Sequence, residues 1–463
     1  MIPSIYGVLI LLFAPFLSAN GTIALITICT VLGGTAAGFL IGLGGATINP
    51  AVFSLIFVFW QAWRNYKNGE LPSVLPLNSP ANWLMILAIW GVISAATLPF
   101  LFQNSDVLIF TFDRFEGGTA PFAIPIRFTS SNISQPGYLV MSWMAMVAMC
   151  ILLRREGAAE VFAKSVLWAS TLNVALGCLN LLQMAGLPDV LAVLRNGSYA
   201  MQSGELAGLV RISGAFPETS AYSAYSLTLL GFTHYLWLRG YLPRWSSSTS
   251  VGSLVLLLLS TSGTAYVGLA VCGVLSLMYL TYRVARYGSA GRVAFYGWLA
   301  LLALILLASA LLFYPKTWTI LSDYFGFVVG KKMESGSGIE RSTWNRQAWS
   351  NFIDTLGLGT GLGTNVGSNF TMVLLSNLGW FGAMAFGAFI WKSFTTPIST
   401  STEAEDIVIK ASRLAILTTL IGANISARVF DLSITFYIFA AGATFRATPT
   451  IHPKPTENSG STT

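Results

Sequence analysis

Charged residues are scarce in this chain of 463 residues, since Asp, Glu, Lys and Arg together make up only 9% of it. A soluble globular protein carries roughly 25% charged residues, so this chain has too little polar surface for a particle in water. Hydrophobic residues make up 54% and occur in long blocks, such as Trp83–Phe102, Gly137–Leu153 and Val293–Phe313. Each block is close to the roughly 20 apolar residues of a transmembrane helix. Soluble, disordered, fibrous and disulfide-rich secreted proteins are therefore excluded.

Motifs that bind metals or nucleotides are also lacking. The chain has four cysteines, all within apolar blocks, and two histidines, His234 and His452. It has no CxxC, no DxD and no glycine-rich loop ending in GK[ST], so neither a zinc site nor a nucleotide site is expected. The net charge is +7, but Lys and Arg form no dense run, and we expect no nucleic-acid partner. The sequence therefore predicts no metal and no cofactor.

Continuous apolar segments are what the chain does contain, and they lack the alternation of β-barrel strands. Helices are then the way to satisfy the backbone in lipid. We therefore predict an all-α fold, a polytopic integral membrane helical bundle of about 12–13 transmembrane helices. It forms one domain over residues 1–446, and residues 447–463 form a disordered cytoplasmic tail. The spans are expected near residues 4–19, 21–43, 48–63, 83–103, 137–153, 160–186, 219–238, 249–260, 264–282, 293–314, 370–392, 409–421 and 429–446.

The positions of Lys and Arg indicate the topology. The short connections on one side hold 15 of the 25 basic residues, which makes them cytoplasmic by the positive-inside rule. Three long segments, 104–136, 187–218 and 315–369, then face outward. Glycines between residues 33 and 45 favour close helix packing or a re-entrant turn. One acidic cluster on the cytoplasmic side is expected to be solvated: Glu403, Glu405 and Asp406.

Residues 315–369 are expected to form a large ordered external loop, because aromatic residues are frequent there. Apolar residues four apart in this loop predict a short helix with one buried face. That face comprises Trp344, Ala348 and Phe352. Arg341 and Asn345 would share a neighbouring face. An amphipathic helix on the membrane or on the bundle would explain the periodicity, but not the contacts of Arg341.

Two polar fragments precede this loop. The first runs from Arg211 to Ser220 and includes Glu218, so that an arginine and a carboxylate stand where a span begins. Arginine matches phosphate oxygens and stays charged, although a structural Arg211–Glu218 pair or a snorkelling arginine would also fit. The second fragment, Ser260–Thr264, is a polar turn between two spans. Its hydroxyls could bind a sugar, or it could be a plain turn of a helical hairpin.

Taken in chain order, these fragments resemble the O-antigen ligase and Wzy-type polymerase superfamily. The shared features are R-x-x-G-x-F before a span, the polar STSGT turn, and a late loop with R-x-x-W, LG-x-G-x-G and S/H-N-x9-G-x-x-G. In this chain they are Arg211/Gly214/Phe216, Ser260–Thr264, Arg341/Trp344, Leu358–Gly363, and Ser368-Asn369 with Gly379 and Gly382. The resemblance covers roughly the C-terminal half, and the expected number of spans agrees with it.

The resemblance implies a membrane-embedded, metal-independent glycosyltransferase in the bacterial inner membrane. Such enzymes polymerise or transfer undecaprenyl-pyrophosphate-linked glycan units at the outer face. The implied partners are the carrier-linked donor, a glycan or lipid-glycan acceptor and membrane lipid, with a chain-length regulator as a further candidate. By similarity, Arg211 and Arg341 would bind the pyrophosphate, with Arg346 a weaker candidate.

One departure from the family pattern bears on the reaction. Ligases of this family commonly have His where this chain has Ser368, and Ser cannot replace it as a base near neutral pH. This favours a polymerase over a ligase that attaches O-antigen to lipid A-core. Glu218 is then the candidate general base, with Ser368 and Asn369 as further candidate catalytic residues. A transporter or flippase of lipid-linked sugars, with the arginines as gates, is the alternative outside the enzymes.

Overall fold

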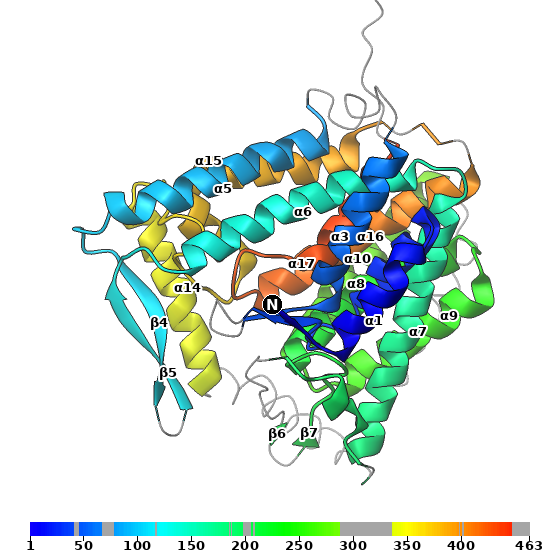
Figure 1. The fold of residues 1–463 in the computed structure, drawn as a ribbon, viewed down its shortest axis with the longest axis horizontal. Helices are drawn as coiled ribbons and strands as arrows, with labels where there is room; N and C mark the ends of the chain where they lie inside the picture. The colour runs from blue at the N-terminus through cyan, green and yellow to red at the C-terminus, as the bar shows by residue number, and fades with distance from the viewer. Residues whose placement is uncertain are drawn as a thin grey trace, which may run out of the picture.

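The chain is described from a computed structural model, which is mostly helical (Figure 1). The structure describes residues 1–40, 46–66, 78–115, 118–184, 186, 188–197, 205–206, 209–287, 336–397, 399–400 and 402–446. Three predicted features lie outside these residues: the span 293–314, the first part of the external loop up to residue 335, and the tail 447–463.

Four helices are long and apolar enough to cross a membrane: α5 (Pro80–Leu101), α6 (Ser131–Leu153), α7 (Ala158–Met184) and α15 (Phe370–Thr395). The other helices that fall on predicted spans are α1 (Ile5–Phe13), α2 (Ala19–Cys29), α3 (Pro50–Asn65), α8 (Thr219–Leu238), α9 (Pro243–Leu259), α10 (Gly263–Tyr287), α16 (Glu403–Ser426) and α17 (Ser433–Thr444). Helix therefore occupies the predicted spans that the structure describes, except in the second half of 21–43.

The predicted helix over residues 21–43 is wrong, because α2 ends at Cys29. The chain then turns and forms strand β2 (Gly38–Leu40), which pairs antiparallel with β3 (Ala46–Ile48) and with β1 (Ile2–Pro3). Between helix and strand, the backbone bonds to a distant segment: the Gly34 N–H donates to the Ala215 carbonyl at 2.7 Å. The described glycines of this stretch, Gly33, Gly34 and Gly38, thus lie in a turn and a strand rather than in a helix.

Short strands in two of the long segments are a further departure from an all-α fold. β4 (Leu108–Phe115) and β5 (Gly118–Pro125) form an antiparallel hairpin in segment 104–136. β6 (Glu205–Leu206) and β7 (Leu209–Val210) pair within segment 187–218. Aromatic and β-branched residues in Leu108–Phe115, with two glycines shortly after them at positions 117 and 118, are typical of a hairpin. In Figure 1 the β4–β5 hairpin lies beside α14 (Gly336–Asp354).

Small polar side chains hydrogen-bond between helices in the interior. Asn173 of α7 donates to Ser226 of α8 at 2.9 Å, and the hydroxyls of Thr228 and Thr419 lie 2.9 Å apart between α8 and α16. Such contacts are typical of helices packed in membranes. α5 and α15 run side by side (Figure 1), and Trp90 Nε1 donates to the Leu378 carbonyl at 2.9 Å across them.

The basic connections meet at one end of the bundle. Arg446 forms an ion pair with Glu405 at 2.7 Å, and Arg154 Nε donates to the Phe445 carbonyl at 2.9 Å. Glu405 is only 6% exposed, so the expectation of a solvated acidic face is wrong for this residue, because Arg446 neutralises it. Glu403 is exposed and lies 3.8 Å from Arg239. The 20 residues of α8 separate this end from Glu218 by about 30 Å.

Candidate functional site

Arg211 lies in an extended segment that leads into a buried turn at Gly214. Asn180 of α7 accepts from the backbone N–H of Ser213 at 2.8 Å and of Gly214 at 3.2 Å. Arg195 donates to the Gly214 carbonyl from Nε at 2.8 Å and from Nη2 at 2.6 Å. Gly214 has a φ of +51°, and a Cβ there would lie 2.9 Å from the Tyr222 ring. The motif glycine is therefore required by the turn itself.

The back of this segment packs on the turn that follows α2. Phe216 is buried, and a Cβ on Gly33 would lie 2.5 Å from its ring. The same ring packs against Tyr225, with centroids 5.0 Å apart. The glycines after α2 thus let the chain support the loop that carries Arg211, a role that the helix-packing interpretation did not anticipate.

Glu218 occupies the N-cap position of α8, with extended backbone angles. Its side chain does not cap the helix; the carboxylate accepts a hydrogen bond from the Ser220 hydroxyl at 2.5 Å. The helix therefore begins at the carboxylate that sequence analysis singled out. Glu218 also acts electrostatically on Arg211.

The predicted helix in the long loop is confirmed as α14. Its apolar face is buried as expected, since Trp344, Ala348 and Phe352 are 7%, 0% and 3% exposed. Arg341 is half-buried on the neighbouring face. Arg346 is exposed and projects about 140° around the helix from Arg341.

Arg211 and Arg341 lie within electrostatic range of each other. Burial lowers the pKa of Arg211, and the positive charge of Arg341 lowers it further, whereas Glu218 and Tyr266 act in the opposite direction. The Nε of Arg211 is buried and has no hydrogen-bond partner among the described residues. Two like charges in a partly desolvated place repel each other, and an anion between them would remove that cost. The structure thus brings together residues from the 187–218 and 315–369 segments.

A further arginine at this site, Arg428, follows α16 and was not singled out from the sequence. Its guanidinium carbon lies 5.2 Å from the centre of the Trp344 ring. Arg428 is at the surface, but the neighbouring protein partly desolvates its guanidinium group and so lowers its pKa. Glu340 and Glu218 act to raise it. The available signal was topological: the compact turn Gly422–Arg428 is basic, although the pattern of Lys and Arg along the chain predicts that it lies on the external side. This exception to the positive-inside rule could have identified Arg428 as a candidate site residue.

The Ser260–Thr264 turn also lies near Arg211. Tyr266, one turn further along α10, acts electrostatically on Arg211 and donates its hydroxyl to the Leu258 carbonyl at 3.0 Å. The Ser262 hydroxyl is buried and has no partner within the described residues. The segment is the turn of a helical hairpin. A contact between its hydroxyls and a sugar stays a prediction.

Ser368 and Asn369 are tied into the scaffold through their hydrogen bonds. The Ser368 N–H donates to Asn345 Oδ1 at 2.8 Å, which joins the segment to α14. Asn369 caps α15, accepting from the Met372 N–H at 3.2 Å, and its Nδ2 donates to the Asn424 carbonyl at 2.7 Å. Both ends of the Asn369 amide therefore have structural partners, and its assignment as a catalytic residue stays a prediction.

The motif glycines hold the chain against the helices. Gly357, Gly359, Gly361 and Gly363 all have positive φ, and a Cβ on Gly363 would lie 2.3 Å from the Ser131 carbonyl oxygen. Gly379 interrupts the helical backbone angles of α15 with a φ of +62°. It packs against the Gly357 carbonyl, and a Cβ on Gly379 would lie 2.3 Å from that oxygen. The loop folds back on the bundle, and these motifs act as scaffold for the charged residues.

No group of three or more His, Cys, Asp or Glu residues that could hold a metal ion occurs in the described part of the chain. Comparison of the chain with protein-family models, curated proteins and solved structures finds no match. The functional assignment therefore depends on the order of the sequence motifs and on the charged residues that meet at Arg211.

Proposed function

We propose that the chain is a polytopic, metal-independent membrane glycosyltransferase that polymerises undecaprenyl-pyrophosphate-linked glycan units at the outer face of the bacterial inner membrane. The observation that supports this most is that the positive charge of Arg341 acts on the partly buried Arg211 and lowers its pKa. A diphosphate is the anion that two converging guanidinium groups suit best, because each forms charge-assisted hydrogen bonds with its oxygens.

In the proposed reaction, an acceptor sugar hydroxyl attacks the anomeric carbon of the donor glycan. The bond from that carbon to the pyrophosphate oxygen breaks, and undecaprenyl pyrophosphate leaves with the bonding electron pair. Negative charge develops on the leaving group, and preorganised cations in a poorly hydrated place stabilise it. Arg211 and Arg341 supply these cations in the proposal, and Arg428 is a third one beside them.

Glu218 is the proposed general base that takes the proton of the acceptor hydroxyl. It lies near both Arg211 and Arg428, as the charge interactions of these two arginines indicate. Its hydrogen bond from Ser220 orients the carboxylate. Ser368 is less suited to this role, because a hydroxyl is a poor base near neutral pH.

The lipid-linked intermediates of a deletion strain test the proposal. A polymerase predicts single repeat units on the carrier in the outer leaflet. Long chains left on the carrier would indicate a ligase, and repeat units retained on the cytoplasmic side would indicate a transporter. Either of the last two results would overturn the assignment. Restoration by the wild-type gene, but not by the Arg341→Ala variant, would tie the phenotype to this site.

A further inference from the structure

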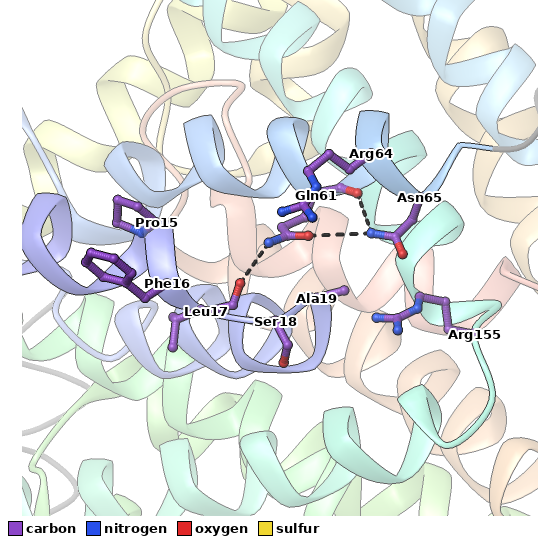
Figure 2. Close-up of a pocket in the computed structure, with 9 residues that line it drawn as sticks. All are labelled: Pro15, Phe16, Leu17, Ser18, Ala19, Gln61, Arg64, Asn65 and Arg155. Atoms are coloured by element: carbon purple, nitrogen blue, oxygen red, sulfur yellow. Dashed lines mark hydrogen bonds between the residues drawn. The ribbon is translucent and has the colours of Figure 1, made fainter.

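A polar cavity of about 380 Å³ lies at the opposite end of the molecule from Arg211. Its walls come from the link between α1 and α2, the end of α3 and the turn between α6 and α7 (Figure 2). The polar groups that line it are Ser18, Gln61, Arg64, Asn65 and Arg155. The 23 residues of α6, about 35 Å of helix, separate this end from the glycine loop that packs on the start of α6.

The walls of the cavity are held in place by their own hydrogen bonds. Gln61 Nε2 donates to the Leu17 carbonyl at 2.8 Å, which fixes α3 to the α1–α2 link. Asn65 Nδ2 donates to the Gln61 carbonyl at 2.7 Å. Figure 2 shows the Arg155 side chain extending into the space between α2 and α3. The two amides are thus engaged with the protein, whereas Arg64 and Arg155 line the cavity as its positive charges.

The two arginines of the cavity differ from three other cations at this end. Arg446, Arg239 and Lys410 each have a carboxylate within 4.0 Å. In the part of the chain that the structure describes, neither Arg64 nor Arg155 forms an ion pair. Two cations that line one polar cavity without a carboxylate form a site for an anion with several oxygens, such as a phosphate group.

The surroundings of the cavity indicate where that phosphate comes from. Trp60 and Trp63 on α3 are 51% and 71% exposed, and Phe16, which lines the cavity, is 88% exposed. Tryptophans beside arginines are typical of the level where lipid headgroups meet acyl chains. Basic pockets between helices on the cytoplasmic side bind anionic lipid headgroups. A polar cavity lined by the exposed Phe16, with Trp60 one helical turn from Arg64, fits a molecule that has both a phosphate and acyl chains.

We infer that Arg64 and Arg155 form a binding site for the phosphate of an anionic glycerophospholipid, separate from the proposed glycosyltransferase site. The lipid headgroup enters the cavity, and its acyl chains lie along Phe16 and Trp60, which is one helical turn from Arg64. The site does not depend on the proposed reaction, and its test uses binding alone.

Native mass spectrometry of the full chain in detergent, titrated with phosphatidylglycerol, tests this site. The Arg64→Ala/Arg155→Ala variant should bind this lipid about fivefold more weakly for each arginine removed. The matched control is Arg244→Ala/Arg286→Ala, which removes the same charge from exposed positions and should bind as the wild type does. Equal loss in both double variants would show general charge attraction and overturn the inference, as would no loss in either.

Two further arms identify the ligand. Arg155→Gln alone should weaken phosphatidylglycerol binding while the thermal unfolding of the lipid-free protein stays unchanged, since the residue is exposed. Inorganic phosphate should compete only weakly. If inorganic phosphate displaced the lipid, or protected the protein as well as phosphatidylglycerol does, the site would be one for free phosphate and the lipid assignment would be wrong.

Discussion

The guanidinium carbon of Arg428 lies 5.2 Å from the centre of the Trp344 indole ring. The two residues come from distant parts of the chain, the α16–α17 connection and α14. The Gly367 N–H also donates to the Arg428 carbonyl at 3.1 Å. These contacts hold α14 against the end of the bundle, and α14 carries Arg341. The stacked pair therefore helps to place one proposed pyrophosphate ligand while it adds a positive charge of its own.

The first prediction concerns this pair. Arg428→Ala should lower the rate of polymer formation by about 100-fold, the usual loss when one preorganised charge-stabilising group is removed. Arg428→Lys keeps the charge but loses the planar group that stacks on Trp344. Its rate should therefore lie between those of the wild type and Arg428→Ala. Initial rates with a purified carrier-linked repeat unit measure this. Val429→Ala, at the exposed neighbouring position, should leave the rate unchanged. Equal rates for the wild type and the Lys variant would argue against the stack, and equal rates for the Ala and Lys variants would argue against the charge.

The second prediction concerns Arg195, which positions the loop of Arg211. Arg195→Ala removes donors to Gly214 and Ser213. It should destabilise the loop by about 1.5–3 kcal/mol, the usual contribution of a hydrogen bond to a charged group. Activity should fall while the helices stay folded. Circular dichroism together with initial rates would measure both effects. Arg127→Ala, an exposed control, should change neither the rate nor the circular dichroism. Wild-type activity in Arg195→Ala would show that Arg195 does not position the loop of Arg211.

The third prediction concerns the turn behind this loop. A Cβ on Gly34 would lie 2.8 Å from the Ala215 carbonyl oxygen, and backbone cannot move aside easily, so Gly34→Ala should destabilise by about 1–3 kcal/mol. Gly387 lies in α15 with nothing within 4 Å of its added Cβ. Gly387→Ala should be neutral, or stabilising by up to about 1 kcal/mol. Thermal unfolding of the purified variants compares the two, and similar midpoints would contradict the close contact.

The fourth prediction concerns pH. Burial raises the pKa of Asp431, in the α16–α17 connection, from 3.8 to about 6, although the Ser433 N–H lowers it in part. The folded state then holds a proton that the unfolded state has lost, so this carboxyl contributes stability below pH 3.8 that disappears as the pH rises through about 6. Unfolding free energy should therefore fall across this window. Asp431→Asn should flatten that part of the profile, and an unchanged slope would exclude Asp431 as its source.

Local patterns predicted the helices well. Apolar periodicity predicted the buried face of α14, and the Arg211–Ser220 fragment was correctly placed at the start of a helix, which begins at Thr219. These features depend on residues a few positions apart, and side chains three or four apart share a helix face. The four helices long enough to cross a membrane also follow from composition alone.

Long-range contacts explain what the sequence did not predict. α2 ends at Cys29, and the turn that follows it is held by a hydrogen bond from Gly34 to the distant Ala215. Glu405 is buried because Arg446, distant in the sequence, neutralises it. Arg428 lies in the candidate site because the connection after α16 packs against α14. In each case the contacting residue is distant in the sequence, and local periodicity cannot predict such a contact.

The most direct test measures polymer formation by purified variants with an undecaprenyl-pyrophosphate-linked repeat unit as the only donor. Arg211→Ala and Arg341→Ala should each lower the initial rate by about 100-fold or more without loss of the folded protein. Arg346→Ala, the exposed arginine on the same helix as Arg341, should stay within about twofold of wild type. Full-length polymer from both Arg211→Ala and Arg341→Ala would contradict the account.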